Sequence, residues 1–220
     1  PAAARVRRTI EEAVRRSAVV NLVYVDQDGA RTTRAVEAVG LYALAMKFAM
    51  LLAFAVSEPF ARAYGPFRFS VLDRPDAEKI QSTVVKFLAA GASLIALGIA
   101  VLTPHVLELM AAPSYHDAYL LVPGLLLGFT ISALTYCFET GILATKKTAQ
   151  LVPVSVFGLV LKVGLNLALL PILGAQGAVL SLIVCNVIHG AIVNHLSFKQ
   201  LPVHYPFPSI ALFIAMAALA

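Results

Sequence analysis

Long apolar segments, almost free of charged residues, follow one another through most of the chain. Five of them cover residues 39–57, 87–103, 119–138, 151–171 and 175–197, and a sixth, 209–220, is only 12 residues long. An α-helix needs roughly 20 apolar residues to cross the hydrocarbon core of a bilayer, and the five match that length. The chain is 60% hydrophobic and only 13% charged, so a water-soluble fold could not bury its apolar surface. The sequence therefore predicts an all-α integral membrane protein, a multi-span helical bundle in which 209–220 is a partial span.

The first 38 residues are of a different kind, because they carry seven Arg and five acidic residues. Residues 5–18 have the spacing of an amphipathic helix. Extended patterns on either side of Asp28-Gly29 are typical of a β-hairpin. We expect residues 1–38 to form a short soluble segment of helix and hairpin, and residues 39–220 to form the membrane unit.

Basic residues are unevenly distributed among the loops between the apolar segments. Loops 58–86, 139–150 and 198–208 contain Lys or Arg, whereas loops 104–118 and 172–174 contain none. Because basic loops of membrane proteins stay in the cytoplasm, this alternation predicts that the first three share the cytoplasmic side. The Arg-rich start of the chain would then lie on the opposite side. We expect either a further span upstream of it or a start that is foreign to the membrane unit.

Lysine and asparagine inside the apolar segments are the first candidate site residues. An ionised side chain at the bilayer centre costs at least about 2.5–3.5 kcal/mol, so such residues point to function. Lys162 falls near the middle of segment 151–171, and Asn166 follows one helical turn later. Lys47 lies about two turns inside segment 39–57. We expect Lys47, Lys162 and Asn166 to bind an anionic substrate group, the alternative being a structural pairing of each lysine with a carboxylate or a carbonyl.

Two carboxylates at the ends of apolar segments are candidates for an ion relay or a gate. Glu139 ends segment 119–138, and Glu58 precedes Pro59 where a kink is expected. A structural or interfacial role is the alternative for both. Asn186 and His189 share a helix face, where we expect hydrogen bonds between helices.

No enzyme motif and no metal-ligand spacing is found in the sequence. Phosphate-binding glycine loops, a Gly-x-Ser-x-Gly elbow and a Cys-x-x-Cys pair are all missing, and the five histidines show no ligand pattern. The net charge of +5 is divided between two unlike segments and does not indicate nucleic-acid binding. We therefore expect no enzymatic activity, no cofactor, no metal and no nucleic-acid partner.

The stretches DRPDAEKI, SYHDAYLLVPGLLLG, ETGILATKKT and VGLNLALLPILGAQGAVLS follow in order after VGLYALAMKFAMLLAFAVSEPFARAYGPFRF. Together they resemble Wzx-like polysaccharide flippases, relatives of the MATE-type multidrug exporters. The resemblance covers residues 39–220 and implies the second half of a transporter in the bacterial inner membrane. That transporter would flip undecaprenyl-pyrophosphate-linked oligosaccharide by alternating access. It implies membrane lipid, the lipid-linked oligosaccharide and the other half of the transporter as partners.

Two alternatives remain open from the sequence. A cation-coupled multidrug exporter of the same superfamily would have acidic cavity residues. The stretch RRTIEEAVRRSAVVNLVYVDQDGARTTRAVEAVGL, in contrast, resembles the start of a WYL domain and would imply a fragment of a transcriptional regulator. The two resemblances meet at Val39–Ala43, which suggests a chimeric join, and the start at Pro1 suggests a fragment.

Overall fold

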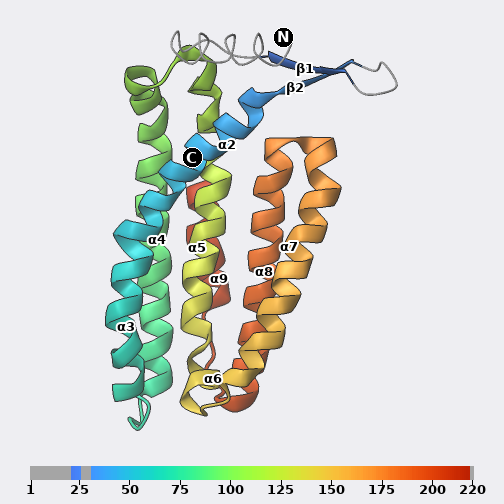
Figure 1. Cartoon of the computed structure of the whole chain (residues 1–220). Helices are drawn as coiled ribbons and strands as arrows, with labels where there is room; N and C mark the ends of the chain where they lie inside the picture. The colour runs from blue at the N-terminus through green and yellow to red at the C-terminus, as the bar shows by residue number, and fades with distance from the viewer. Residues whose placement is uncertain (1–20, 26–30, 219–220) are drawn as a thin grey trace.

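The computed structural model describes residues 21–25 and 31–218 of the chain, mostly as helices (Figure 1). Its elements are β1 (Asn21–Val25), β2 (Arg31–Ala35), α2 (Val36–Leu52), a π-helical turn η1 (Ala53–Ser57), α3 (Glu58–Ser70), α4 (Ala77–Met110), a 3-10 segment η2 (Pro113–Leu120), α5 (Val122–Phe138), α6 (Thr140–Ala144), a 3-10 turn η3 (Thr148–Gln150), α7 (Leu151–Leu173), α8 (Ala175–Gln200) and α9 (Phe207–Ala218).

Five helical segments within the described residues are long and apolar enough to cross a membrane. They are Gly40–Ser70, Ala77–Met110, Tyr115–Ala144, Thr148–Leu173 and Ala175–Gln200. The prediction of a helical unit with five helices of spanning length is thereby confirmed. The sixth apolar segment forms α9, which has 12 residues.

The helices extend further than the apolar segments from which they were predicted. The first continues through η1 to Ser70, and the second begins at Ala77 and runs through Pro104 to Met110. The predicted loop 58–86 is therefore wrong, because only residues 71–76 separate α3 from α4. Hydropathy detects the part of a helix that suits hydrocarbon, whereas backbone hydrogen bonding continues the helix into polar turns at either end.

At the N-terminal end, β1 and β2 pair antiparallel, with Asn21 opposite Ala35 and Val25 opposite Arg31. The helix expected over residues 5–18 and the Asp28-Gly29 turn lie outside the described residues. Helix α2 follows β2 directly and begins at Val36. The predicted boundary at Ala38 therefore falls inside a helix.

Helix α5 is the centre of the bundle. It contacts α2, α4, α8 and α9, and ten of its 17 residues are buried. In Figure 1, α3 and α4 stand on one side of α5, and the α7–α8 pair stands on the other. Val154 is the one buried residue of α7, a helix that is described throughout. The outer face of α7 is thus available to lipid or to further helices.

The three basic loops lie together at one end of the bundle, called here the basic end. Lys147 Nζ donates to Gln200 Oε1 over 2.8 Å, which joins the α6–η3 turn to the end of α8. The backbone N–H of His204 donates to Glu78 Oε1 over 2.9 Å, which joins the α8–α9 segment to the start of α4. Figure 1 shows η2 and the α7–α8 turn at the opposite end, where β1 and β2 also lie. Loops predicted to share one side of a membrane are therefore neighbours in the fold.

Two groups at this end have perturbed acidities outside the helices of spanning length. Hydrogen bonds from Arg74 hold the pKa of the Asp76 carboxyl below its ordinary value. Burial raises the pKa of the Tyr205 hydroxyl, which donates to the carbonyl of Cys137 over 3.3 Å. Tyr205 is therefore a neutral hydrogen-bond donor that ties the α8–α9 segment to the end of α5.

Small residues bring α8 close to its neighbours. A Cβ added at Gly124 of α5 would lie 2.5 Å from Val179, and one added at Gly128 would lie 2.9 Å from Leu182. At the α7–α8 turn Gly174 has a φ of +58°, which suits glycine because it lacks a Cβ. Close approach through small residues is the usual way in which helices pack where burial from water gives little driving force.

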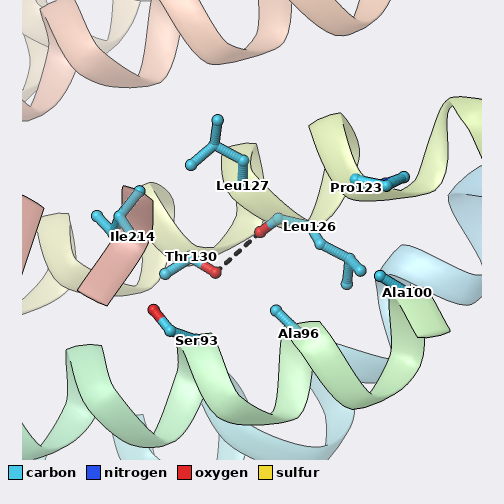
Figure 2. Close-up of a pocket in the computed structure, with 8 residues that line it drawn as sticks. All are labelled: Ser93, Ala96, Ala100, Pro123, Leu126, Leu127, Thr130 and Ile214. Atoms are coloured by element: carbon cyan, nitrogen blue, oxygen red, sulfur yellow. Dashed lines mark hydrogen bonds between the residues drawn. The ribbon is translucent and has the colours of Figure 1, made fainter. Parts of the chain in front are cut away.

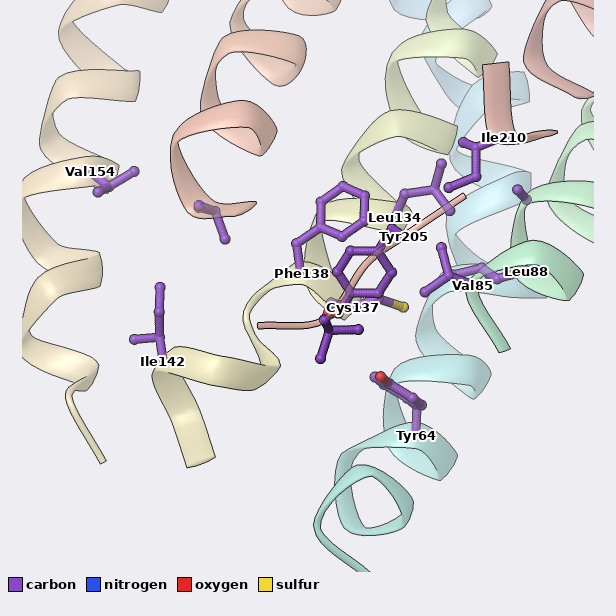
Figure 3. Packing of buried hydrophobic residues seen from close by; sticks show 13 residues of the cluster. Tyr64, Val85, Leu88, Leu134, Cys137, Phe138, Ile142, Val154, Tyr205 and Ile210 are labelled. Carbon is purple, nitrogen blue, oxygen red and sulfur yellow. Dashed lines mark hydrogen bonds between the residues drawn. The ribbon is translucent and has the colours of Figure 1, made fainter. Parts of the chain in front are cut away.

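Buried side chains form two clusters, one towards each end of the bundle. The cluster at the basic end includes Tyr64, Cys137, Ile142 and Tyr205. A cavity of about 20 Å³ lies between α4 and α5, where Ser93 and Thr130 face each other (Figure 2). Figure 3 shows the cluster at the basic end, with Tyr64 reaching it from α3.

Candidate functional site

A polar pocket of about 420 Å³ opens between η1, α3, α5 and α8. Its walls contain carboxylate, hydroxyl, amide and imidazole groups together with three aromatic rings. The lining residues are Ala53, Ser57, Glu58, Phe60, Ala61, Phe129, Ser132, Ala133, Thr135, Tyr136, Glu139, Asn186 and His189. We call it the Glu58–Glu139 pocket. It lies in the half of the bundle nearer the basic end, because its α5 residues come from the second half of that helix.

The π-helical turn η1 and Pro59 form the wall that α3 contributes. Proline has no N–H to continue the helical ladder, and its ring collides with the carbonyl four residues earlier. A π-helical turn over Ala53–Ser57 widens the helix immediately before Pro59 and accommodates that collision. Glu58, expected at a kink or gate, therefore stands where the helix departs from α geometry. It pairs over 3.5 Å with Arg62, and both side chains are more than half exposed.

Glu139 lies at the junction of α5 and α6 and is half-buried. The Thr140 hydroxyl donates to the Cys137 carbonyl over 2.7 Å, which satisfies a backbone acceptor where the helix is interrupted. Within the part of the chain that the structure describes, no basic group lies within ion-pair distance of Glu139. Of the two carboxylates in the pocket, Glu58 has an exposed ion-pair partner, Arg62, and Glu139 has no ion-pair partner among the described residues.

Helix α8 contributes Asn186 and His189 from one of its faces. Asn186 Nδ2 donates to the Gly128 carbonyl over 2.8 Å, so the predicted bond between helices is confirmed for this residue. His189 lines the same pocket. Its imidazole adds a hydrogen-bonding group beside the two carboxylates.

The lysines expected to bind an anionic group do not line this pocket. Lys47 and Lys162 are exposed on α2 and α7, and the ammonium group of neither forms a hydrogen bond or ion pair with the described residues. Asn166 donates to the Lys162 backbone carbonyl and accepts from the Ser181 hydroxyl over 3.0 Å. The structure therefore brings Glu58 and Glu139 together at one pocket and leaves both lysines exposed and outside it.

A buried arginine near the pocket was missed in the sequence, where Arg68 was counted among the charges of a loop. Arg68 is only 4% exposed on α3, and its Nη2 donates to the Tyr136 hydroxyl over 2.8 Å. Its guanidinium carbon lies 4.5 Å from the centre of the Tyr136 ring. The aromatic residues on either side of Arg68, at positions 67 and 69, were the available signal, since arginine packs well on aromatic rings.

Across the described residues, no three His, Cys, Asp or Glu side chains gather closely enough to hold a metal ion. The two carboxylates and the histidine of the pocket belong to no such group.

Comparisons with known proteins found no relative: no family model matches the chain, and no curated protein and no solved structure matches it. The chemistry of the pocket and the pattern of the sequence must therefore support any function assigned to the chain.

Proposed function

We propose that the chain is a multi-pass protein of the bacterial inner membrane, with the basic end in the cytoplasm. The five helices of spanning length support a membrane location. The contacts that join Lys147 to Gln200 and His204 to Glu78 support a common side for the three basic loops. Exposed apolar side chains along α7, among them Leu159, Val160 and Leu167, suit contact with lipid tails or with further helices.

We propose that the bundle is part of a transporter, and that its cargo is lipid-linked oligosaccharide. The observation that carries the proposal is the Glu58–Glu139 pocket, because it is a polar opening among helices that are otherwise apolar. Polar groups inside membrane helices are costly and mark the routes of substrates and ions. The π-helical turn at the pocket wall supplies a point at which one helix can bend. The choice of cargo rests on the resemblance of residues 39–220 to polysaccharide flippases.

In this proposal Lys47, Lys162 and Asn166 meet the pyrophosphate group on a surface completed by further helices, such as the other half of the transporter. The exposure of both lysine side chains is compatible with such a surface. The carboxylates of Glu58 and Glu139 then serve proton or ion exchange in the pocket, away from the anionic group that they would repel.

A vesicle assay with fluorescent lipid-linked oligosaccharide tests the cargo and the role of Lys162. We expect Lys162→Ala to lower the rate of flipping by about 10- to 150-fold, since a charge-assisted contact contributes about 1.5–3 kcal/mol. Lys199→Ala, at the last turn of α8 in the basic end, is the matched control and should keep the wild-type rate. Equal rates for wild type and Lys162→Ala, each assayed together with the other half of the transporter, would remove Lys162 from the mechanism, and no flipping by that wild-type assembly would reject the cargo.

A second candidate is a cation-coupled exporter of cationic compounds. It is favoured by one observation: the pocket is lined by two carboxylates and three aromatic rings, and by no lysine or arginine. Such a lining attracts organic cations through charge and through ring faces. Efflux of a cationic dye that is abolished by Glu139→Gln, with no flipping of oligosaccharide, would establish this alternative.

A further inference from the structure

Arg68 is a buried cation on α3, and α5 satisfies most of its polar atoms. Its Nη2 donates to the Tyr136 hydroxyl over 2.8 Å, and its Nη1 donates to the Tyr136 carbonyl over 3.4 Å. The guanidinium also lies within 6 Å of the rings of Tyr64 and Phe69. Its Nε has no hydrogen-bond partner among the described residues. The burial of this charge therefore depends on a single residue of another helix, Tyr136.

Tyr136 connects this contact to the Glu58–Glu139 pocket. Its side chain lines the pocket, and its hydroxyl donates to the carbonyl of Ala61 on α3 over 3.3 Å. The hydroxyl thus accepts from Arg68 and donates to the backbone carbonyl of Ala61, about two turns earlier on the same helix. Loss of this hydroxyl would leave a buried charge without its best acceptor, which is among the most destabilising single changes.

Helix α3 has few other polar ties to the bundle. The Tyr64 hydroxyl lies 3.4 Å from the Thr140 hydroxyl, and no further hydrogen bond between α3 and another helix is found in the described residues. Figure 3 shows Tyr64 reaching from α3 towards the part of the cluster that contains Cys137. At its other end α3 joins α2 through the π-helical turn next to Pro59. A hinge at one end and a side-chain contact at the other are the two parts of a movable flap.

We propose that α3 is a flap over the Glu58–Glu139 pocket, that it swings on η1, and that the Arg68–Tyr136 contact is the latch that holds it closed at the basic end. Phe60 and Ala61 of α3 and Tyr136 of α5 lie on opposite walls of the pocket, so outward movement of α3 opens the pocket towards the basic end. The role of this movement in transport rests on the proposed function, whereas the movement itself is inferred from the contacts of α3 alone.

Cys137 reports the opening without any added probe. It is fully buried next to Tyr136, in the cluster that Tyr64 of α3 covers. In a Cys185→Ala background, labelling by a membrane-impermeant maleimide measures how often water reaches Cys137. We expect Tyr136→Phe to raise the labelling rate about tenfold, and only from the basic side of oriented vesicles, because a hydrogen bond to a charged group is lost. Tyr119→Phe removes an exposed hydroxyl from η2 at the other end and should label at the wild-type rate.

Adding Arg68→Met to Tyr136→Phe separates the loss of the Arg68–Tyr136 contact from the cost of burying an unpaired charge. The double variant buries no unpaired charge but still lacks the latch, so its labelling at Cys137 should stay above the wild-type rate, and a return to the wild-type rate would overturn the proposal. Wild-type labelling in Tyr136→Phe would overturn the proposal. Equal gains at Cys185, measured in a Cys137→Ala background, would also overturn it, because they would indicate unfolding of the whole bundle. The labelling uses no substrate, so raised labelling in Tyr136→Phe, together with no flipping by the wild type in the presence of the other half of the transporter, would reject the proposed cargo and keep the flap.

Discussion

Gly141 makes the tightest contact between α6 and α8, and its replacement by alanine tests whether the bundle is packed as described. A Cβ at this position would lie 2.5 Å from the Ser197 carbonyl oxygen and 2.6 Å from the Ser197 hydroxyl. The Gly141 N–H also donates to that hydroxyl over 2.9 Å, and both residues are buried. Because one of the opposing atoms belongs to the backbone of α8, a rotamer change cannot relieve the clash.

The expected loss follows from three contributions. Overpacking of a tight contact costs about 1–3 kcal/mol, and loss of the Gly141–Ser197 hydrogen bond costs about 1 kcal/mol. Alanine regains up to about 1 kcal/mol through its better helix propensity. We therefore expect Gly141→Ala to lower the free energy of unfolding by about 1–3 kcal/mol, which corresponds to a fall in Tm of a few to about 10 °C for a chain of this size.

Gly164→Ala on α7 is the matched control, since a Cβ there would meet nothing within 4 Å. It carries the helix-propensity gain without the clash, so its Tm should equal or exceed that of the wild type. The assay is thermal unfolding of the purified chain in detergent, followed by circular dichroism. If Gly141→Ala unfolds at or above the temperature of Gly164→Ala, then α6 and α8 do not approach as closely as described and the reasoning fails.

Two further changes are expected to stabilise the chain. Lys146 has a φ of +58°, a left-handed conformation that costs a residue with a Cβ about 1–2 kcal/mol, so Lys146→Gly should raise the free energy of unfolding by about 1 kcal/mol in the same assay. The buried Ser93 hydroxyl has no partner among the described residues, so Ser93→Ala should raise the free energy of unfolding by about 1 kcal/mol. A fall in Tm for Ser93→Ala would show instead that the cavity beside Thr130 holds a bridging water.

The spanning helices could be predicted from the sequence because hydropathy alone identifies them. Segment 175–197 contains no charged residue, and the structure has a helix over Ala175–Gln200. The ends could not be predicted as well, because hydropathy marks only the apolar part of a helix and the backbone hydrogen bonds continue beyond it. Pro104 lies inside α4, and Pro59 lies in the first turn of α3, where its missing N–H is tolerated once η1 has widened the helix. Proline by itself disfavours the interior of a helix, but the geometry of the preceding turn determines whether the helix ends there.

The sequence indicated the two carboxylates of the pocket, Glu58 and Glu139, but not the buried arginine beside it. A charge inside an apolar segment stands out in the sequence, and Lys162 stands out for that reason although it is exposed and outside the pocket. Arg68 was overlooked because it stands among other basic residues, yet it is the buried one. Arg68 differs from Lys162 in having a hydrogen-bond partner on another helix, the hydroxyl of Tyr136. That partner lies 68 residues later in the chain, so the sequence around Arg68 does not reveal it. Residue type therefore suggests which side chains are costly to bury, whereas only the approach of α3 to α5 determines which of them is buried.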